Sequence, residues 1–154
     1  MSAVAEQQTA DLRTILFRVT RVTLIVVGAL PWIAPLVTPR WTLPGSVIWA
    51  LDSGFDAVCH RIPERAMPLA GTMMPICSRC AGIFAGLAIG ALIARPRLSL
   101  KKTIVLIGIT SALMLADVVT QDLGMHPVWH PTRIATGIAV GYVLAVGLLS
   151  TLRR

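Results

Sequence analysis

The three cysteines of this 154-residue chain lie in two short motifs that also contain basic residues. Cys59 begins the run C-H-R, and Cys77 and Cys80 are the two cysteines of the run C-S-R-C. A C-x-x-C motif at the start of a helix brings both sulfurs to one turn, where unpaired backbone N–H groups favour the thiolate. Two thiolates so placed can bind a soft metal ion or exchange with a disulfide.

The first interpretation is a transition-metal site. Three sulfurs and one imidazole form a tetrahedral set that suits zinc best, with copper or iron as alternatives. The predicted ligands are Cys59, His60, Cys77 and Cys80. Adjacent residues of a helix point about 100° apart, so Cys59 and His60 can share one ion only if their helix ends there. Pro63 favours such an end, and His126 or His130 of a later loop are the alternative imidazole ligands.

The second interpretation is redox chemistry, in which Cys77 and Cys80 form an exchangeable disulfide and Cys59 acts as a shuttle. Membrane enzymes that pass electrons from thiols to quinone are similar in outline, but they normally carry a second pair of cysteines. This chain has three cysteines in all, so the metal interpretation is favoured over the redox one. A third possibility is a structural subunit of a larger membrane complex, with no chemistry of its own.

Charged residues near the cysteine motifs predict a second, polar cluster. Asp117 lies inside an apolar run, about one turn from its end, where a carboxylate is costly unless it is paired or faces a cavity. An inter-helix salt bridge and a proton relay are both open roles for it. Arginines near the same depth could pair with Asp117 or bind an anion such as a lipid headgroup. The predicted ligand-binding residues are Arg61, Arg65, Arg79, Asp117 and Arg133.

The composition predicts that membrane helices position these residues. The chain is 55% hydrophobic and 14% charged, with a mean hydropathy of +0.76, whereas soluble domains carry about 25% charged residues. Each span needs roughly 20 apolar residues, and four apolar runs are present: 22–37 with its start extended to Ile15, 80–94, 103–120 and 134–152. We therefore predict an all-α integral membrane protein, with residues 1–14 as a tail and 15–154 as one domain of four transmembrane helices.

The predicted outer loop, residues 38–80, contains the cysteine motifs and one additional helix. Thr42 and Pro44 are typical of a helix start, and apolar residues then recur every three or four positions as far as Val58. This spacing predicts a helix that lies in the membrane interface.

Small residues recur every four positions on the second and fourth predicted spans, which allows two helix backbones to approach closely. They are Gly82, Gly86 and Gly90 on one span and Gly137, Gly141 and Ala145 on the other. We expect these two faces to pack together inside the bundle. Similar faces could also bind helices of partner proteins.

The distribution of positive charge predicts the orientation in the membrane. Nine of the 14 basic residues lie in the N-terminal tail, the loop between the second and third spans, and the C-terminus. Basic residues accumulate on the cytoplasmic side, so both termini are expected in the cytoplasm and the cysteine motifs on the outer face of the inner (cytoplasmic) membrane. The net charge is +7, but the sequence shows no soluble module with a basic face and interleaved aromatic residues. Nucleic acid is therefore not expected as a partner. The expected partner is the lipid bilayer, with anionic lipid or quinone as possible ligands.

The two motifs also resemble a family of small bacterial and archaeal membrane proteins, domain of unknown function 2085. The runs C-H-R-I-P-E-R, from Cys59 to Arg65, and P-I-C-S-R-C-A-G, from Pro75 to Gly82, carry the resemblance. The family pattern continues with an aspartate late in the next helix and R-x-x-T-G at the start of the last. The resemblance implies that these residues form one site, without implying a particular activity. The matching positions are Cys59, His60, Pro63, Arg65, Cys77, Arg79, Cys80, Gly82, Asp117, Arg133, Thr136 and Gly137.

Overall fold

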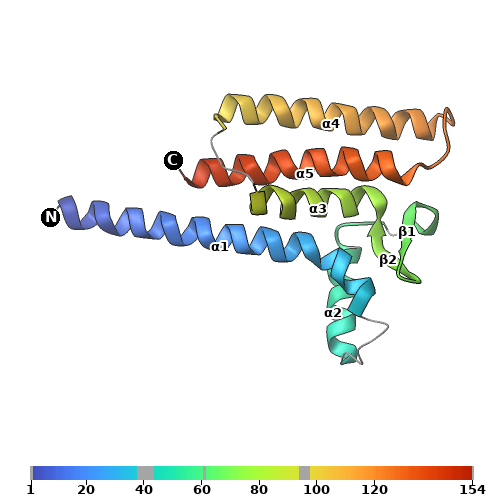
Figure 1. The fold of residues 1–154 in the computed structure, drawn as a ribbon, viewed down its shortest axis with the longest axis horizontal. Helices are drawn as coiled ribbons and strands as arrows, with labels where there is room; N and C mark the ends of the chain where they lie inside the picture. The colour runs from blue at the N-terminus through green and yellow to red at the C-terminus, as the bar shows by residue number, and fades with distance from the viewer. Residues whose placement is uncertain (1, 38–43, 61, 94–97, 154) are drawn as a thin grey trace.

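Four long helices lie side by side in the order α1, α3, α5, α4, and α2 extends away from the bundle near the C-terminal end of α1, roughly perpendicular to the long helices (Figure 1). The computed structural model describes residues 2–37, 44–60, 62–93 and 98–153, without the side chains of residues 2–6 and 52. The elements are α1 (Ser2–Val37), α2 (Gly45–Asp56), a short 3-10 helix (Pro63–Arg65), β1 (Ala66–Leu69), β2 (Thr72–Cys77), α3 (Ser78–Ile93), α4 (Leu100–Asp122) and α5 (His130–Leu152).

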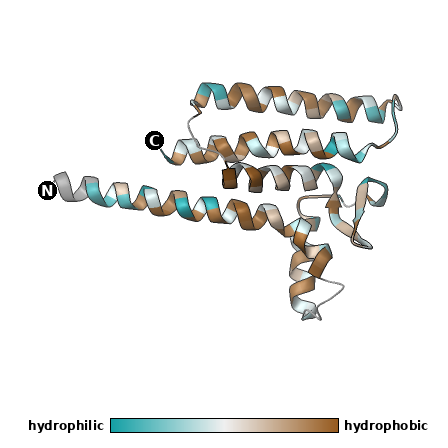
Figure 2. Cartoon of the chain, viewed as in Figure 1, coloured by the Kyte–Doolittle hydropathy of each residue, from teal (hydrophilic) through white to brown (hydrophobic). Residues whose placement is uncertain are grey.

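Three of the described helices are long and apolar enough to cross a membrane: Gln7–Val37 within α1, α4 and α5. α3 is apolar but has 16 residues, fewer than the roughly 20 that a span needs. Hydrophobic residues extend along α4 and the middle of the other long helices, while hydrophilic residues gather toward helix ends and on the N-terminal half of α1 (Figure 2). The predicted helical membrane protein is confirmed, whereas the fourth span and the interfacial position of α2 stay predictions.

A β-hairpin precedes α3, so the expectation of an exclusively helical chain is wrong in this segment. β1 and β2 pair antiparallel, with Leu69 opposite Thr72. The two residues between the strands, Ala70 and Gly71, have φ of 52° and 82°. Two consecutive positive φ values define the tight hairpin turn whose twist matches that of paired strands. The hairpin ends at Cys77 and leads directly into α3.

The small-residue faces of α3 and α5 pack directly against each other, as predicted. A Cβ added at Gly86 would meet the backbone nitrogen of Tyr142 at 2.8 Å, and one added at Gly137 would meet the backbone nitrogen of Ile83 at 2.9 Å. Real Cβ atoms do not approach other atoms below 3.0 Å. Only hydrogen fits at these positions, because the two backbones are in van der Waals contact.

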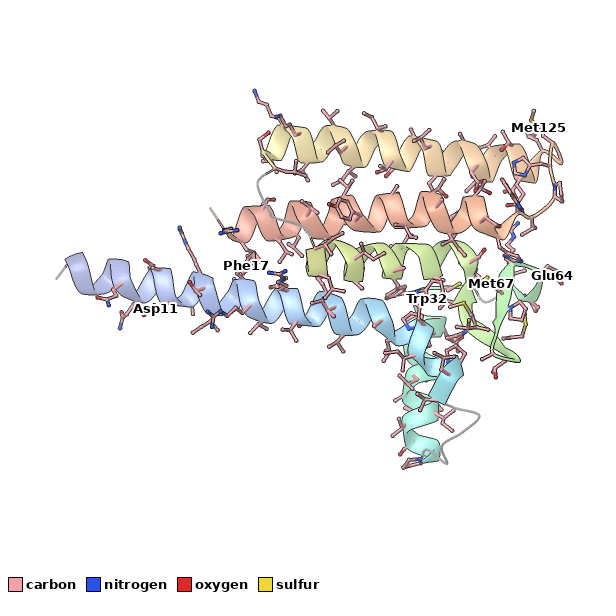
Figure 3. The ribbon with its side chains drawn as sticks, in the orientation of Figure 1. Asp11, Phe17, Trp32, Glu64, Met67 and Met125 are labelled. Carbon is pink, nitrogen blue, oxygen red and sulfur yellow. The ribbon has the colours of Figure 1, made fainter. Side chains whose placement is uncertain are left out.

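α1 holds α3 at both of its ends. The Arg21 side chain donates hydrogen bonds to the carbonyl oxygens of Ala91, at 2.6 Å, and Leu92, at 2.8 Å. These carbonyls lie in the last turn of α3, where no intrahelical donor remains. Near the other end, Trp32 Nε1 donates to the carbonyl oxygen of Ala81 at 3.1 Å. Figure 3 shows Trp32 at the end of the bundle that also holds the hairpin residue Met67 and Glu64.

The two ends of the bundle hold different elements. Both chain termini lie toward one end, together with the C-terminal end of α3 and the start of α4 (Figure 1). The opposite end holds α2, the hairpin and the connection between α4 and α5. The cysteine motifs and the starts of α3 and α5 therefore belong to the same end, away from the termini.

Candidate functional site

The three cysteines converge from three different elements. Cys59 follows α2, Cys77 ends β2, and Cys80 lies in the first turn of α3. Their sulfur atoms all lie within 4.8 Å of one another. The backbone N–H of Cys77 donates to Cys59 Sγ at 3.3 Å, and all three cysteines are free thiols. The structure thus brings Cys59 to two cysteines that follow it 18 and 21 positions later in the chain, and we call the three sulfurs the cysteine cluster.

A small apolar core fixes the cysteine cluster. Cys59 is itself buried and belongs to a hydrophobic cluster with Phe55 of α2, Ile76 of β2 and Ala81 of α3. The backbone N–H of Cys59 donates to the carbonyl oxygen of Phe55 at 3.0 Å, which extends the helical path of α2 as far as this cysteine. Because β2 leads directly into α3, Cys77 and Cys80 are held on consecutive elements with no intervening loop.

The cysteine cluster favours a thiolate at Cys77. Hydrogen bonds, the strongest from the Cys80 thiol, together lower the pKa of Cys77 to about 5, although burial opposes this shift. The thiol of Cys59 and the backbone N–H of Arg79 add hydrogen bonds that lower the same pKa. Hydrogen bonds to the charged form favour it, so Cys77 is the sulfur best prepared to act as a metal ligand or a nucleophile.

The predicted histidine ligands lie outside the cysteine cluster. His60 is exposed and is not part of the group of close ligand atoms, although it follows Cys59 directly. His126 bonds instead to the Thr120 hydroxyl, with Nε2 and Oγ1 2.9 Å apart. Arg61, another predicted site residue, lies outside the described residues. Among the described residues the close group holds three sulfurs and no fourth ligand.

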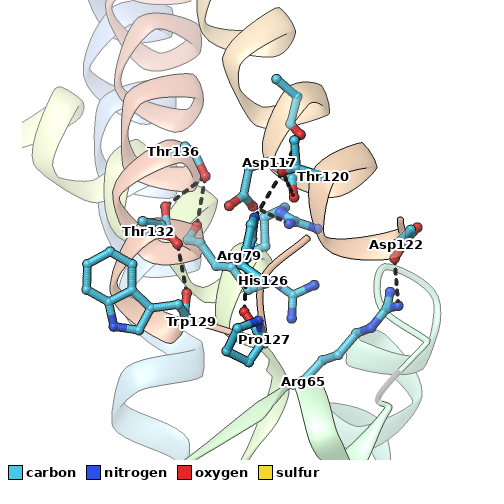
Figure 4. Close-up of polar contacts among 12 residues, drawn as sticks. Arg65, Arg79, Asp117, Thr120, Asp122, His126, Pro127, Trp129, Thr132 and Thr136 are labelled. Carbon is cyan, nitrogen blue, oxygen red and sulfur yellow. Dashed lines mark hydrogen bonds and ion pairs between the residues drawn. The ribbon is translucent and has the colours of Figure 1, made fainter. Parts of the chain in front are cut away.

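Asp117 forms an inter-helix ion pair with Arg79. Arg79 Nη2 donates to Asp117 Oδ2, and the two side chains are 12% and 11% exposed (Figure 4). A second pair, between Arg65 and Asp122, spans 3.2 Å and is more exposed, at 36% and 57%. The structure therefore joins two of the predicted arginines to carboxylates of α4. Whether these residues also bind a ligand stays a prediction.

Arg133, at the start of α5, is the predicted site residue with the most unusual environment. Its side chain is 2% exposed, and Nε and Nη1 are buried without a hydrogen-bond partner. It lies within electrostatic range of Arg79, Cys77 and Asp117. The arginine predicted to bind a ligand is thus buried within electrostatic range of both the cysteine cluster and the Arg79–Asp117 pair.

The same residues carry the match to known proteins. The family described as "Predicted membrane protein (DUF2085)" matches residues 59–146, which include the three cysteines, both ion pairs and Arg133. The chain belongs to this family. α1 and α2 lie outside the matched residues, so the family region begins at the cysteine that follows α2.

Two archaeal relatives are similar to the chain. An uncharacterized protein of Methanothermobacter thermautotrophicus is 34% identical over 95 residues, 60% of this chain and 85% of that protein. One of Methanocaldococcus jannaschii is 27% identical over 101 residues, 62% of this chain. The chain spans 64% of the length of this second relative, less than two thirds of it. No solved structure matches the chain.

Two polar residues of this region have surroundings that the sequence does not indicate. Ser78 is fully buried, and its Oγ has no hydrogen-bond partner. His130 is half-buried, and its Nδ1 also has no hydrogen-bond partner. The available signal for Ser78 was its place between Cys77 and Arg79 at a helix start. The sequence suggests His130 as an alternative metal ligand. In the structure it begins α5, one turn before Arg133.

Proposed function

We propose that this membrane protein binds a transition metal, with zinc favoured, through Cys59, Cys77 and Cys80. The observation that carries the proposal is the approach of three free sulfurs to within 4.8 Å of one another. In a tetrahedral site with Zn–S bonds of about 2.3 Å, two sulfurs lie about 3.8 Å apart. Small side-chain rotations would be enough to reach that spacing. Thiolate ligands suit zinc, copper(I) and iron, and zinc is the simplest fit to sulfur ligands without redox chemistry.

The ligand count supports a site with an open position. Structural zinc sites have four protein ligands, whereas catalytic sites have three and leave the fourth position to water or substrate. Three sulfurs form the close group among the described residues, and His60 is exposed. His60 remains the proposed fourth ligand only if the segment after Cys59 rotates toward the sulfurs. An exchangeable fourth ligand is therefore our preferred form of the proposal.

The expected result of elemental analysis is about one equivalent of zinc, copper or iron per chain in detergent-purified protein. Cys77→Ser should lose most of that metal, because one of three thiolates is removed and the metal is bound by few ligands. Thermal unfolding should also become insensitive to chelator in this variant. The measurement is metal content by mass spectrometry of the purified chain, together with a count of free thiols under non-reducing conditions.

Two control variants sharpen this test. Ser78→Ala changes the residue next to Cys77 without removing a sulfur, and it should retain the metal. His60→Ala separates the two forms of the site: retained metal supports three sulfurs with an exchangeable ligand, and lost metal supports His60 as the fourth ligand. Absence of metal from the wild-type protein would contradict the proposal in both forms.

A second candidate function is thiol oxidation coupled to quinone. It is favoured by the hydrogen bond between the Cys77 and Cys80 side chains and by an apolar pocket of about 260 Å³ beside the cluster. This pocket is lined by Val27, Leu51, Phe55 and Phe84, among others, and Phe55 also packs against Cys59. In the reaction, two thiols would become one disulfide, and two electrons and two protons would reduce a quinone to a quinol. Wild-type protein without metal, and with two of its three thiols oxidised until reductant is added, would favour this candidate.

We further propose that the cysteine cluster lies on the outer face of the cytoplasmic membrane. The excess of basic residues near the termini and the start of α4 supports this orientation. Met125 of the α4–α5 connection is 71% exposed, and Thr151 near the C-terminus is also exposed. Treating intact cells with a membrane-impermeant maleimide should add one label to Met125→Cys, relative to the parent protein, and none to Thr151→Cys. The reverse labelling would contradict the orientation.

A further inference from the structure

The buried side-chain nitrogen and oxygen atoms that lack a hydrogen-bond partner, within the described part of the chain, all lie at the starts of α3 and α5. Ser78 and Arg79 are the first two residues of α3, and His130 and Arg133 are in the first turn of α5. The unpartnered atoms are Ser78 Oγ, Arg79 Nε, His130 Nδ1, and Nε and Nη1 of Arg133. Natural proteins pair the large majority of such atoms. Their gathering in one region therefore indicates a missing acceptor.

The starts of the two helices lie at the same level. A Cβ added at Gly137, one turn after Arg133, would overlap the carbonyl oxygen of Arg79, and one added at Gly82 would meet Cα of Ile134 at 2.9 Å. The turn of α3 that begins with Ser78 thus packs against the turn of α5 that contains Arg133. Each helix start adds unpaired N–H groups and the positive end of its dipole. Two helix starts of this kind favour an anion between or beside them.

Arg133 differs from the other described arginines of the region in having no carboxylate partner. Arg79 is paired with Asp117, and Arg65 with Asp122. No ion pair is found for Arg133 among the described residues, although its side chain is 2% exposed. An isolated guanidinium cannot lose its proton to escape this cost. Cys77 and Asp117 lie within electrostatic range of Arg133, but no carboxylate of the described residues pairs with it. A further anion would therefore offset the cost of burying its charge.

We propose that Arg133, assisted by the adjacent donors of α3 and α5, binds an oxyanion of the phosphate type. Arg133 has no acceptor capacity, Arg79 Nε is a donor, and serine and histidine can donate, so the ligand must accept several hydrogen bonds. A phosphate group offers more acceptor oxygens than a carboxylate, and guanidinium groups bind it well. This inference does not depend on the proposed metal, because it rests on Arg133 and the two helix starts.

A pocket lies at the same end of α5 as these donors and is lined by residues that adjoin two of them. Its volume is about 310 Å³, and it is lined by Asp117, His126, Pro127, Trp129 and Thr132. Asp117 is the partner of Arg79, and Thr132 precedes Arg133 in the chain. Trp129 is exposed at the same end of α5, a position typical of residues at the headgroup level of a membrane. The phosphate group could therefore belong to an anionic lipid or be free in solution.

Phosphate binding by the full-length protein in neutral detergent, freed of anionic lipid, tests the inference. Sodium phosphate should raise the unfolding temperature above its value in sodium chloride of equal ionic strength. Arg133→Gln should weaken phosphate binding by about tenfold or more, the loss expected for one charge-assisted hydrogen bond. Arg153→Gln, at the other end of α5 and exposed, is the matched control and should bind phosphate as the wild type does. If Arg133→Gln does not fold, Arg133→Lys keeps the charge and should still bind phosphate measurably more weakly.

A second arm distinguishes the two sources of phosphate. Native mass spectrometry after incubation with phosphatidylglycerol, with phosphatidylcholine as the neutral comparison, should show a retained anionic lipid in wild-type protein and less in the Arg133 variants. Retention of the lipid without a response to inorganic phosphate assigns the site to a headgroup; a response to inorganic phosphate alone assigns it to a free anion. Wild-type protein that binds neither, or Arg133 variants that bind both unchanged, would overturn the inference. Metal content of the same samples keeps this outcome separate from the metal proposal, since Arg133→Gln should retain its metal.

Discussion

Gly141→Ala is expected to destabilise the protein by about 3 kcal/mol or more, at the upper end of the cost of overpacking a core. The added methyl group would overlap the carbonyl oxygen of Ile83, and would lie 3.0 Å from the backbone nitrogen of Leu87. Backbone atoms of a packed helix cannot move aside as a flexible side chain can. α3 and α5 would have to separate along their length. Thermal unfolding in detergent, followed by circular dichroism, measures the effect.

Gly108→Ala is the matched control for this prediction. Gly108 lies within α4, and a Cβ added there meets no atom within 4 Å. Alanine is the better helix former by about 1 kcal/mol, so this variant should be as stable as the wild type or slightly more stable. Equal losses in the two variants would show that glycine itself, rather than close contact between α3 and α5, determines the effect.

The contact between α3 and α5 also connects the fold to the candidate site. Gly82 lies two residues after Cys80, and Gly137 lies one turn after Arg133. Because the backbones of α3 and α5 are in direct contact at these glycines, the contact fixes the level of the cysteine cluster relative to Arg133. A change in this packing would therefore be felt at both the metal ligands and the proposed anion site.

The sequence predicted the parts of the fold that depend on periodic patterns. Long apolar runs correspond to α1, α4 and α5, and small residues at four-residue spacing correspond to the packed faces of α3 and α5. Both patterns reflect constraints that act on every turn of a membrane helix. The apolar run predicts a span that starts near Ile15, whereas the helix α1 begins at Ser2, because polar residues continue a helix beyond its apolar part.

The hairpin and the partners of the charged residues could not be obtained in this way. β1 and β2 are short and contain Pro68 and Pro75, which are unusual in strands, and the turn depends on Ala70 adopting a positive φ. Spacing along the chain gathers the cysteines in one region but does not give the direction of His60. Nor does it indicate which arginine is left without a carboxylate, since that depends on side-chain reach across three helices.

Asp117→Ala is expected to destabilise the protein by about 3–5 kcal/mol, the cost of leaving one charge of a buried pair without its partner. Arg79 would remain at 12% exposure near the end of an apolar helix, and its Nε already lacks a hydrogen-bond partner. The loss of the carboxylate would leave two arginines, Arg79 and Arg133, without an ion pair in the same region. The measurement is again thermal unfolding in detergent.

Asp122→Ala provides the matched control, because it removes the carboxylate of the exposed Arg65–Asp122 pair on the same helix. Exposed ion pairs contribute about 0–1 kcal/mol, so this variant should unfold close to the wild type. The double variant Arg79→Met and Asp117→Leu should recover much of the lost stability, since apolar residues often replace a buried pair without cost. If phosphate or anionic lipid restores stability to Asp117→Ala, the freed Arg79 has joined Arg133 in binding an anion. A small effect of Asp117→Ala, equal to that of Asp122→Ala, would instead mean that water or lipid headgroups reach Arg79, and that this pair does not hold α4 to α3.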